Sequence, residues 1–202
     1  MLKIPKGSED YILAQRTDYK KRGSVLDFGK DLYSAYEEMV PFLPHGTKDT
    51  FRILDIGSGM GGIDVFLSRH YAGKAEITLL DKEGDPNKVT YGFVENGDDV
   101  SPYSNFDRAL ELLTMNGVDL SKIHTHDITQ KTFPDTEFNI VISLISWGFH
   151  YPISTYAPKL VSGGVIIADV RKGTDGMEAL SEMGDITIIN EKSKSFLLAC
   201  QT

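Results

Sequence analysis

From residue 51 onward, short apolar runs alternate along the chain with segments whose apolar residues recur at helical spacing. Apolar runs of this kind are typical of strands that are buried on both faces of a parallel sheet. They occupy residues 53–56, 75–81, 138–146 and 160–169, and a shorter, more polar strand is predicted at 121–126. Strands that alternate with helices predict an α/β domain with a mostly parallel sheet and helices on both faces. One of these helices is expected to have Ser104 as its cap and to end at Asn116-Gly117.

The first 50 residues follow a different pattern, which predicts helices without strands. Ser8 is a candidate cap for a short helix, and a second helix is expected to begin at Ser24 and to end before Pro41. The apolar stripe of this second helix consists of Val25, Phe28, Leu32, Tyr36 and Met39. We therefore expect residues 1–50 to form a helical appendage that acts as a lid, and residues 51–202 to form the main domain.

The main domain begins with a strand, a glycine-rich turn and a helix. The strand residues Phe51–Ile56 lead into Gly57-Ser58-Gly59-Met60-Gly61-Gly62, and apolar residues at helical spacing follow. Glycines permit a tight turn and a close approach of a ligand to the backbone, and the next helix presents free N–H groups. The spacing of Gly57, Gly59 and Gly62 also satisfies the dinucleotide-binding fingerprint, so the glycines alone leave the ligand open.

Asp55 distinguishes between the two readings, because it lies two residues before the first glycine. A carboxylate at this place would repel a pyrophosphate, whereas S-adenosylmethionine carries an ammonium and a sulfonium and no phosphate. The run Leu54–Gly61 resembles motif I of the class I S-adenosylmethionine-dependent methyltransferases. This resemblance covers about residues 51–202 and implies a Rossmann-like, seven-stranded, mostly parallel sheet that ends in an antiparallel hairpin, here at 186–190 and 195–201.

The resemblance also implies a set of residues that bind S-adenosylmethionine. Asp81 ends the second strand, 24 positions after Gly57 (81 − 57), and a carboxylate there can accept hydrogen bonds from both ribose hydroxyls. Asp127 and Ile128 follow the third strand, where the family holds the adenine ring. The expected cofactor-binding residues are Asp55, Gly57, Ser58, Gly59, Met60, Gly61, Asp81, Lys82, Asp127, Ile128 and Ser143.

Substrate and catalytic residues are expected beside these strand ends. Residues 84–104 form a long insertion at the ligand edge, and Trp147–Tyr151 follow the fourth strand, where the family delivers its reactive edge. The candidates for substrate binding are Tyr91, Phe93, Tyr103, Trp147, Phe149 and Tyr151, joined in the appendage by Tyr11, Tyr19, Tyr33 and Tyr36. His150 is the candidate base, because imidazole has a suitable pKa; a structural histidine bound to a carbonyl is the alternative.

Composition, charge and the absence of certain motifs limit the class of substrate that is expected. The chain has a formal net charge of −8, which disfavours general binding to nucleic acids. The sequence Ser146-Trp147-Gly148-Phe149 differs from the Asn/Asp-Pro-Pro-aromatic motif of nucleic-acid amino methyltransferases. The end of the fourth strand also lacks the carboxylates that a metal site would need, and Asp169 is the one remaining acidic candidate. We expect a small hydroxylated metabolite such as a sugar, or an amine, as the methyl acceptor, and no metal.

The sequence also gives expectations for the cellular context. There is no apolar run long enough to span a membrane and no signal-peptide core, so a cytoplasmic protein is expected. A homodimer remains possible through the appendage. Two other functions remain open: an NAD(P)-dependent oxidoreductase, which rests on the glycine spacing alone, and a non-catalytic partner subunit that binds the cofactor without turnover.

Overall fold

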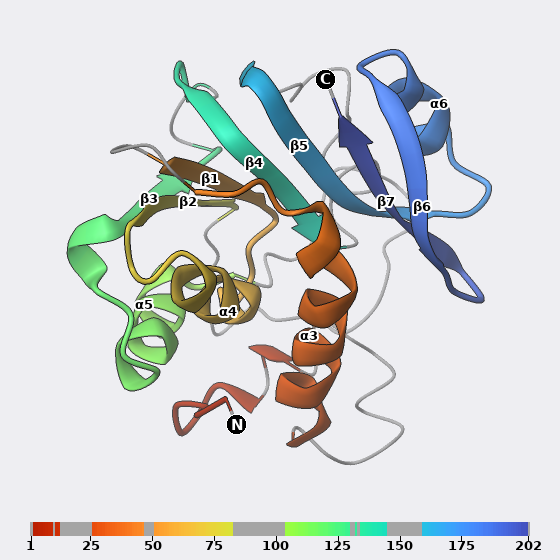
Figure 1. Ribbon diagram of the computed structural model, residues 1–202. Coiled ribbons are helices and arrows are strands. Elements are labelled where there is room, and N and C mark those ends of the chain that lie inside the picture. Colours follow the sequence, from red (N-terminus) through yellow and green to blue (C-terminus); the bar gives the residue numbers. More distant parts are fainter. Residues whose placement is uncertain are drawn as a thin grey trace.

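The structure is a computed structural model, and it describes residues 2–9, 11–12, 26–46, 51–82, 104–129, 132, 134–144 and 159–201. Its centre is one seven-stranded sheet (Figure 1). The strands are β1 (Phe51–Ile56), β2 (Ala75–Asp81), β3 (Ile123–Asp127), β4 (Glu137–Leu144), β5 (Lys159–Arg171), β6 (Asp185–Glu191) and β7 (Ser195–Gln201). Each predicted strand is present, with ends that differ by a few residues from those expected.

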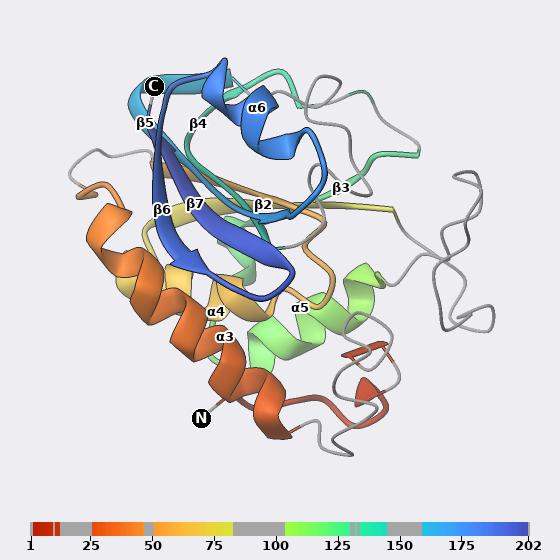
Figure 2. The same ribbon diagram turned by 90° about the vertical axis from the view of Figure 1, so that its right-hand side faces the viewer.

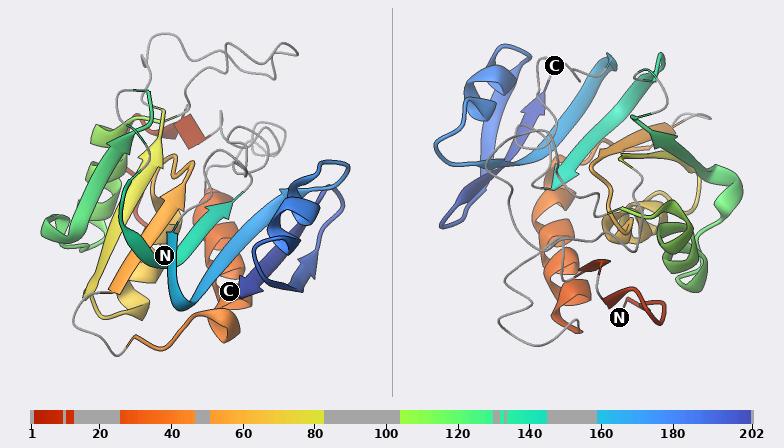
Figure 3. Two further views of the ribbon diagram at one scale, coloured as in Figure 1. Left: turned by 90° about the horizontal axis from the view of Figure 1, so that it is seen from above. Right: turned by 180° about the vertical axis from the view of Figure 1, so that it is seen from behind.

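The strands lie in the order β3-β2-β1-β4-β5-β7-β6, which Figure 3 shows from above. Strands β1 to β5 pair in parallel, and β7 is antiparallel to both β5 and β6. The expected mostly parallel sheet with a closing antiparallel hairpin is thus confirmed. Strands β2 and β3 extend the sheet on one side of β1, and β4 and β5 extend it on the other, so the strand order reverses between β1 and β4. Ligands of open α/β sheets bind beyond the carboxyl ends of the strands at such a point.

Helices cover both faces of the sheet, as the sequence predicts (Figure 2). One face carries α3 (Leu26–Met39), α4 (Gly62–His70) and α5 (Phe106–Met115), and the other carries α6 (Gly176–Ser181). Alternate strand residues divide the core between these two layers: Ile53 of β1 belongs to the cluster under α4, and Leu54 to the cluster under α6. This period-2 division is what a sheet covered on both faces requires.

Three of the five residues of the N-terminal stripe are buried as predicted, whereas Tyr36 is partly exposed and Val25 lies outside the described residues. Phe28, Leu32 and Met39 of α3 are all in the core that α4 and the sheet share. A Cβ added to Gly62, the first residue of α4, would meet the ring of Phe28 at 3.1 Å, so α3 packs directly on the start of α4. The helix ends at Met39, and Pro41 lies in the 3-10 turn η1 (Val40–Phe42) that follows.

The start of α5 is one residue away from its expected position. The sequence suggests Ser104 as the cap, but Asn105 is the N-cap, and its side-chain oxygen accepts a hydrogen bond from the N–H of Arg108 at 2.9 Å. Ser104 is instead fully buried, and its hydroxyl donates to the carbonyl of Gly59 at 3.4 Å. The glycine turn therefore takes the residue that local preference alone would have placed at the cap.

Gly184 offers a test of the closing hairpin. It precedes β6, and a Cβ there would lie against the main-chain carbonyl of Gln201 in β7, 2.8 Å from the carbonyl carbon and 3.2 Å from Sγ of Cys200. Because backbone atoms cannot move aside cheaply, we expect Gly184→Ala to lower the free energy of unfolding by about 2–4 kcal/mol in urea denaturation. Gly163→Ala is the control, since its φ of +76° costs only about 1 kcal/mol and its surroundings are open. Equal losses in both variants would contradict a backbone clash at Gly184.

Within the part of the chain that the structure describes, no helix combines the length and apolar character that crossing a bilayer requires.

Candidate functional site

The glycine turn between β1 and α4 lies at the carboxyl end of the sheet. Gly57, Gly59 and Gly61 all have positive φ, at 71°, 54° and 65°, a backbone conformation that side chains with a Cβ rarely adopt. The N–H groups of Gly57 and Ser58 donate to the carbonyl of Leu80 at 2.8 and 3.2 Å, which joins the start of the turn to the end of β2. The backbone of the turn therefore requires glycine at these three positions.

Asp81 links the tip of β2 to this turn. One oxygen of its carboxylate accepts a hydrogen bond from the N–H of Gly59 at 2.7 Å, and the other accepts from the N–H of Lys82 at 2.8 Å. A carboxylate has about four lone-pair sites and can accept several hydrogen bonds at once. The predicted ribose-binding residue is thus held in place at the edge of the turn.

A pair of buried carboxyl groups lies beneath the turn. Asp55 of β1 is 3% exposed, and Asp64 in the first turn of α4 is fully buried. Burial raises the pKa of Asp64 to about 7. Burial also raises the pKa of Asp55 well above its ordinary range, and the nearby carboxyls of Asp64 and then Asp81 raise it further. Three acidic groups therefore lie around a single loop, and Asp55 is affected by the other two.

Asp64 is the residue that the sequence reasoning missed. An acidic residue in the first turn of a helix is a common way to satisfy the helix dipole, so Asp64 gave no signal of burial. In the structure every residue from Gly62 to Ser68 is buried, so the start of α4 has no solvent-facing side and the carboxyl at position 64 lies inside. The sequence of α4 alone carries no sign of this.

The end of β3 lies beside the end of β2, as the resemblance implies. Asp127 pairs with Asp81 in the parallel register, and the N–H of Ile128 donates to the carbonyl of Asp81 at 3.0 Å. One carboxylate oxygen of Asp127 accepts from the N–H and the hydroxyl of Thr129, at 2.9 and 2.7 Å. The two positions expected to hold an adenine ring are therefore adjacent to the position expected to hold its ribose.

Three other expected cofactor residues have mainly internal contacts. The hydroxyl of Ser143 in β4 donates to the carbonyl of Ile56 at 2.7 Å, across the point where the strand order reverses. Met60 is 1% exposed and belongs to the core beneath α4. The carbonyl of Ser58 accepts from the N–H of Gly61 at 2.9 Å and closes the turn. These residues shape the loop, whatever contact they make with a ligand.

The candidate base and the substrate candidates of the main domain lie outside the described residues. They are His150, Tyr91, Phe93, Tyr103, Trp147, Phe149 and Tyr151, and the structure leaves these predictions untested. Of the other histidines, His126 at the end of β3 contacts the carbonyl of Thr132 through Nε2 at 2.7 Å. In the described ranges, no three His, Cys, Asp or Glu side chains are grouped so that they could hold a metal ion.

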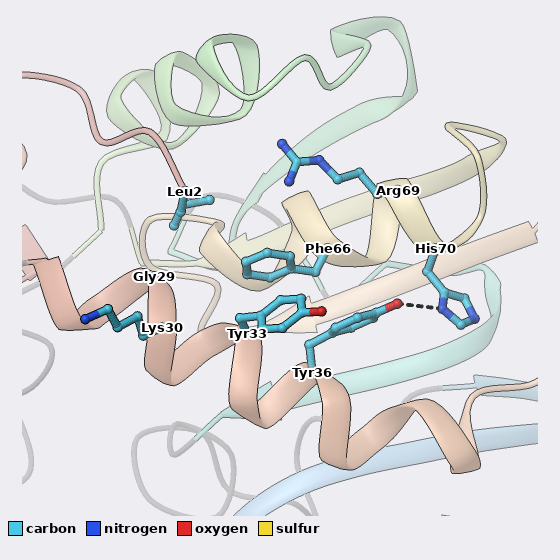
Figure 4. Close-up of a pocket in the computed structure, with 8 residues that line it drawn as sticks. All are labelled: Leu2, Gly29, Lys30, Tyr33, Tyr36, Phe66, Arg69 and His70. Carbon is cyan, nitrogen blue, oxygen red and sulfur yellow. Dashed lines mark hydrogen bonds between the residues drawn. The ribbon is translucent and has the colours of Figure 1, made fainter.

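A groove of about 550 Å³ lies apart from the glycine turn, between α3 and α4 (Figure 4). Its floor is aromatic: the ring of Tyr36 stacks on Phe66 with centroids 5.7 Å apart, and Tyr33 contacts Phe66 edge-on. The hydroxyl of Tyr36 lies 2.9 Å from Nδ1 of His70. Two tyrosines that were candidates for the substrate pocket thus line this groove, roughly 10 Å along α4 from the turn at the helical rise of about 1.5 Å per residue.

Comparison with known proteins gives similarity in structure without similarity in sequence. No known family profile and no curated protein matches the chain. An S-adenosylmethionine-dependent O-methyltransferase from Thermotoga maritima matches with a TM-score of 0.57 and 14% identity, over 86% of this chain and 64% of that one. YjhP from Escherichia coli matches with a TM-score of 0.51 and 15% identity, over 89% of this chain and 73% of that one.

A third solved structure, a precorrin-6y C5,15-methyltransferase from Geobacter metallireducens, matches with a TM-score of 0.52 and 14% identity, over 77% of this chain and 81% of that one. The chain spans less than two thirds of the Thermotoga protein. The sheet order, the closing hairpin and these matches show the class I Rossmann-like methyltransferase fold, as the sequence resemblance implied. Because a fold hosts many functions, activity must be argued from the site.

Proposed function

We propose that this protein binds S-adenosylmethionine at the glycine turn and transfers its methyl group to a small molecule. The observation that supports this most strongly is the acidity of the turn. Asp55, Asp64 and Asp81 all lie at it, and the carboxyls of Asp64 and Asp81 add to burial in raising the pKa of Asp55. A pyrophosphate in this loop would meet carboxylates, whereas the ammonium and sulfonium of S-adenosylmethionine would be attracted to them.

The residues present fit this cofactor part by part. The positive-φ glycines leave open backbone at the turn, Asp81 can accept from the ribose hydroxyls, and Ile128 with Asp127 would hold the adenine. Asp55, two residues before the first glycine of the turn, would be the partner of the ammonium. When bound, S-adenosylmethionine would supply a methyl carbon that the sulfonium has already activated for displacement. The protein's own contribution would be to align the acceptor and remove its proton.

For the acceptor we propose a hydroxyl group of a small metabolite, with an amine as the second choice. The acidic chain and the absence of a nucleic-acid amino-methylation motif support a small molecule. One structural match is an O-methyltransferase, but another is a precorrin methyltransferase, so the fold itself does not select the acceptor. An NAD(P)-dependent oxidoreductase is disfavoured by the acidic turn, and a non-catalytic cofactor-binding subunit would lack turnover.

Titration calorimetry of the full chain with S-adenosylmethionine, S-adenosylhomocysteine and NAD tests the cofactor. We expect both adenosyl ligands to bind and NAD to give no binding heat at the same concentration. Binding of NAD alone would contradict the proposal and favour an oxidoreductase. Failure to bind any of the three ligands would contradict it as well, and would leave the fold without this function.

The proposed base gives a separate prediction. His150→Ala should leave the Kd for S-adenosylmethionine within about 2-fold, because the residue would act on the acceptor, and should lower kcat by roughly 10²–10⁴-fold. The measurement is S-adenosylhomocysteine formation with a panel of sugars, phenols and amines. His126→Ala is the control, since that ring contacts the carbonyl of Thr132 and has no proposed role in the reaction. Unchanged turnover in His150→Ala would make His150 a structural residue.

A further inference from the structure

The carboxyl of Asp64 is a fully buried ionisable group that the proposed reaction does not use. In the described part of the chain, no donor side chain is paired with its oxygens, and the side chain that interacts with them is the equally acidic carboxyl of Asp55. A Cβ built on Gly61 would lie 3.5 Å from Oδ2, so the carboxyl is directly beneath the glycine turn. A buried carboxylate without a partner is costly, and such groups often have a role in binding or catalysis.

Among the described residues, no positively charged group is found to act on Asp64 or Asp55. The neighbouring carboxyl is Asp55 on β1, and the charged group that acts on this pair from β2 is Asp81, which is also acidic. On the helical side the neighbours are apolar: Leu113 of α5 lies against Gly61, and Phe28 and Leu32 of α3 lie against Gly62. Two ionised carboxylates are acceptors only, so Asp55 and Asp64 can hydrogen-bond to each other only when one of them keeps a proton.

We propose that Asp64 is a positioning residue for the ammonium of the cofactor, and that it acts by sharing one proton with Asp55 which is released when the ammonium binds. The inference rests on the proposed function. In the protein without ligand, the shared proton would offset the missing positive charge and hold the two carboxyls together. The ammonium would replace that proton as the positive partner of Asp55, and the proton would pass to solvent. No bond in the ligand changes in this step.

The coupling predicts the direction of a pH effect. A ligand that binds the deprotonated pair more tightly must bind more tightly as pH rises through the range in which Asp64 titrates, at about pH 7. The amino group of the ligand itself titrates near pH 8, and its binding beside a carboxylate would take up protons. Net proton release at pH 7 therefore cannot come from the ligand.

Calorimetric titrations of S-adenosylhomocysteine at pH 7.0, in phosphate and in Tris, measure this release from the difference in buffer ionisation heats. We expect the wild-type protein to release about 0.5–1 proton per bound ligand. Asp64→Asn keeps the shape and removes the shared proton, so it should bind the ligand with release reduced at least by half. A merely structural role for Asp64 would change affinity or stability but leave the number of protons unchanged.

A second ligand makes the test independent of the variant. Methylthioadenosine has the adenosine and the thioether but lacks the ammonium and the carboxylate, so its binding to the wild-type protein should release no proton. Equal release with both ligands, or release below about 0.1 proton with S-adenosylhomocysteine, would overturn the inference while leaving the proposed function intact. Absence of binding by S-adenosylmethionine and S-adenosylhomocysteine would overturn both.

Discussion

Replacing Asp81 with alanine should weaken the binding of S-adenosylmethionine by roughly 100-fold or more. The carboxylate would lose its hydrogen bonds to the ribose hydroxyls, and bonds to a charged acceptor contribute about 1.5–3 kcal/mol each. The substitution would also remove the acceptor of the hydrogen bond from the N–H of Gly59, which is 2.7 Å long in the wild type, so the turn would lose an anchor to β2. Titration calorimetry of wild type and variant at one pH and salt concentration measures the change directly.

Glu76→Ala is the matched control for this prediction. Glu76 lies on the same strand, β2, at its opposite end, and carries the same charge. It forms ion pairs with Arg52 and Lys122 at 3.6 and 3.8 Å, both partly exposed, so its loss should cost little stability. We expect the Kd of Glu76→Ala for S-adenosylmethionine to stay within about 2-fold of the wild-type value, because solvent and salt screen a charge that lies at the far end of the strand from the glycine turn. Equal weakening in both variants would mean a general charge effect, and an unchanged Kd in Asp81→Ala would remove Asp81 from the site.

The elements that sequence reasoning placed correctly are those whose signal is local and strong. The strand at 75–81 was predicted with the bounds that β2 has, because an apolar run ends there at a single acidic residue. The glycine turn was predicted from its repeated glycines, and Gly57, Gly59 and Gly61 do occupy positive φ in the structure. A backbone requirement of that kind is written directly into the residue type, whatever the rest of the chain does.

The features that the sequence did not reveal depend on contacts between distant segments. Ser104 and Asn105 are both good helix caps, and the choice between them was decided by the carbonyl of Gly59, 45 positions earlier in the chain. Asp64 is buried because α3 covers the start of α4, which no periodicity within α4 shows. The groove lined by Tyr33 and Tyr36 likewise exists only because α3 lies against α4 (Figure 4).

Asp64→Asn should make the ligand-free protein more stable at pH 8 than the wild type. Asp64 has a pKa of about 7 in the folded protein because of its burial, against an ordinary value of 3.8. A group whose pKa is raised by folding binds protons more tightly in the folded state, so stability is highest at low pH and falls as pH rises through the folded pKa. We expect the free energy of unfolding of the wild type to fall between pH 5 and pH 8 by on the order of 2–4 kcal/mol more than that of the variant. Urea denaturation at both pH values measures this.

Asp119→Asn is the control that separates burial from charge. Asp119 caps the 3-10 turn η3 (Leu120–Lys122) on the surface, and the N–H of Ser121 lowers its pKa, which is the opposite direction. Its substitution removes one negative charge, as Asp64→Asn does, but should not raise stability at pH 8. If the two variants changed the pH dependence equally, the effect would come from net charge. If Asp64→Asn ran parallel to the wild type between pH 5 and pH 8, the buried pair would carry no proton, and the proton release proposed for ligand binding would have no source.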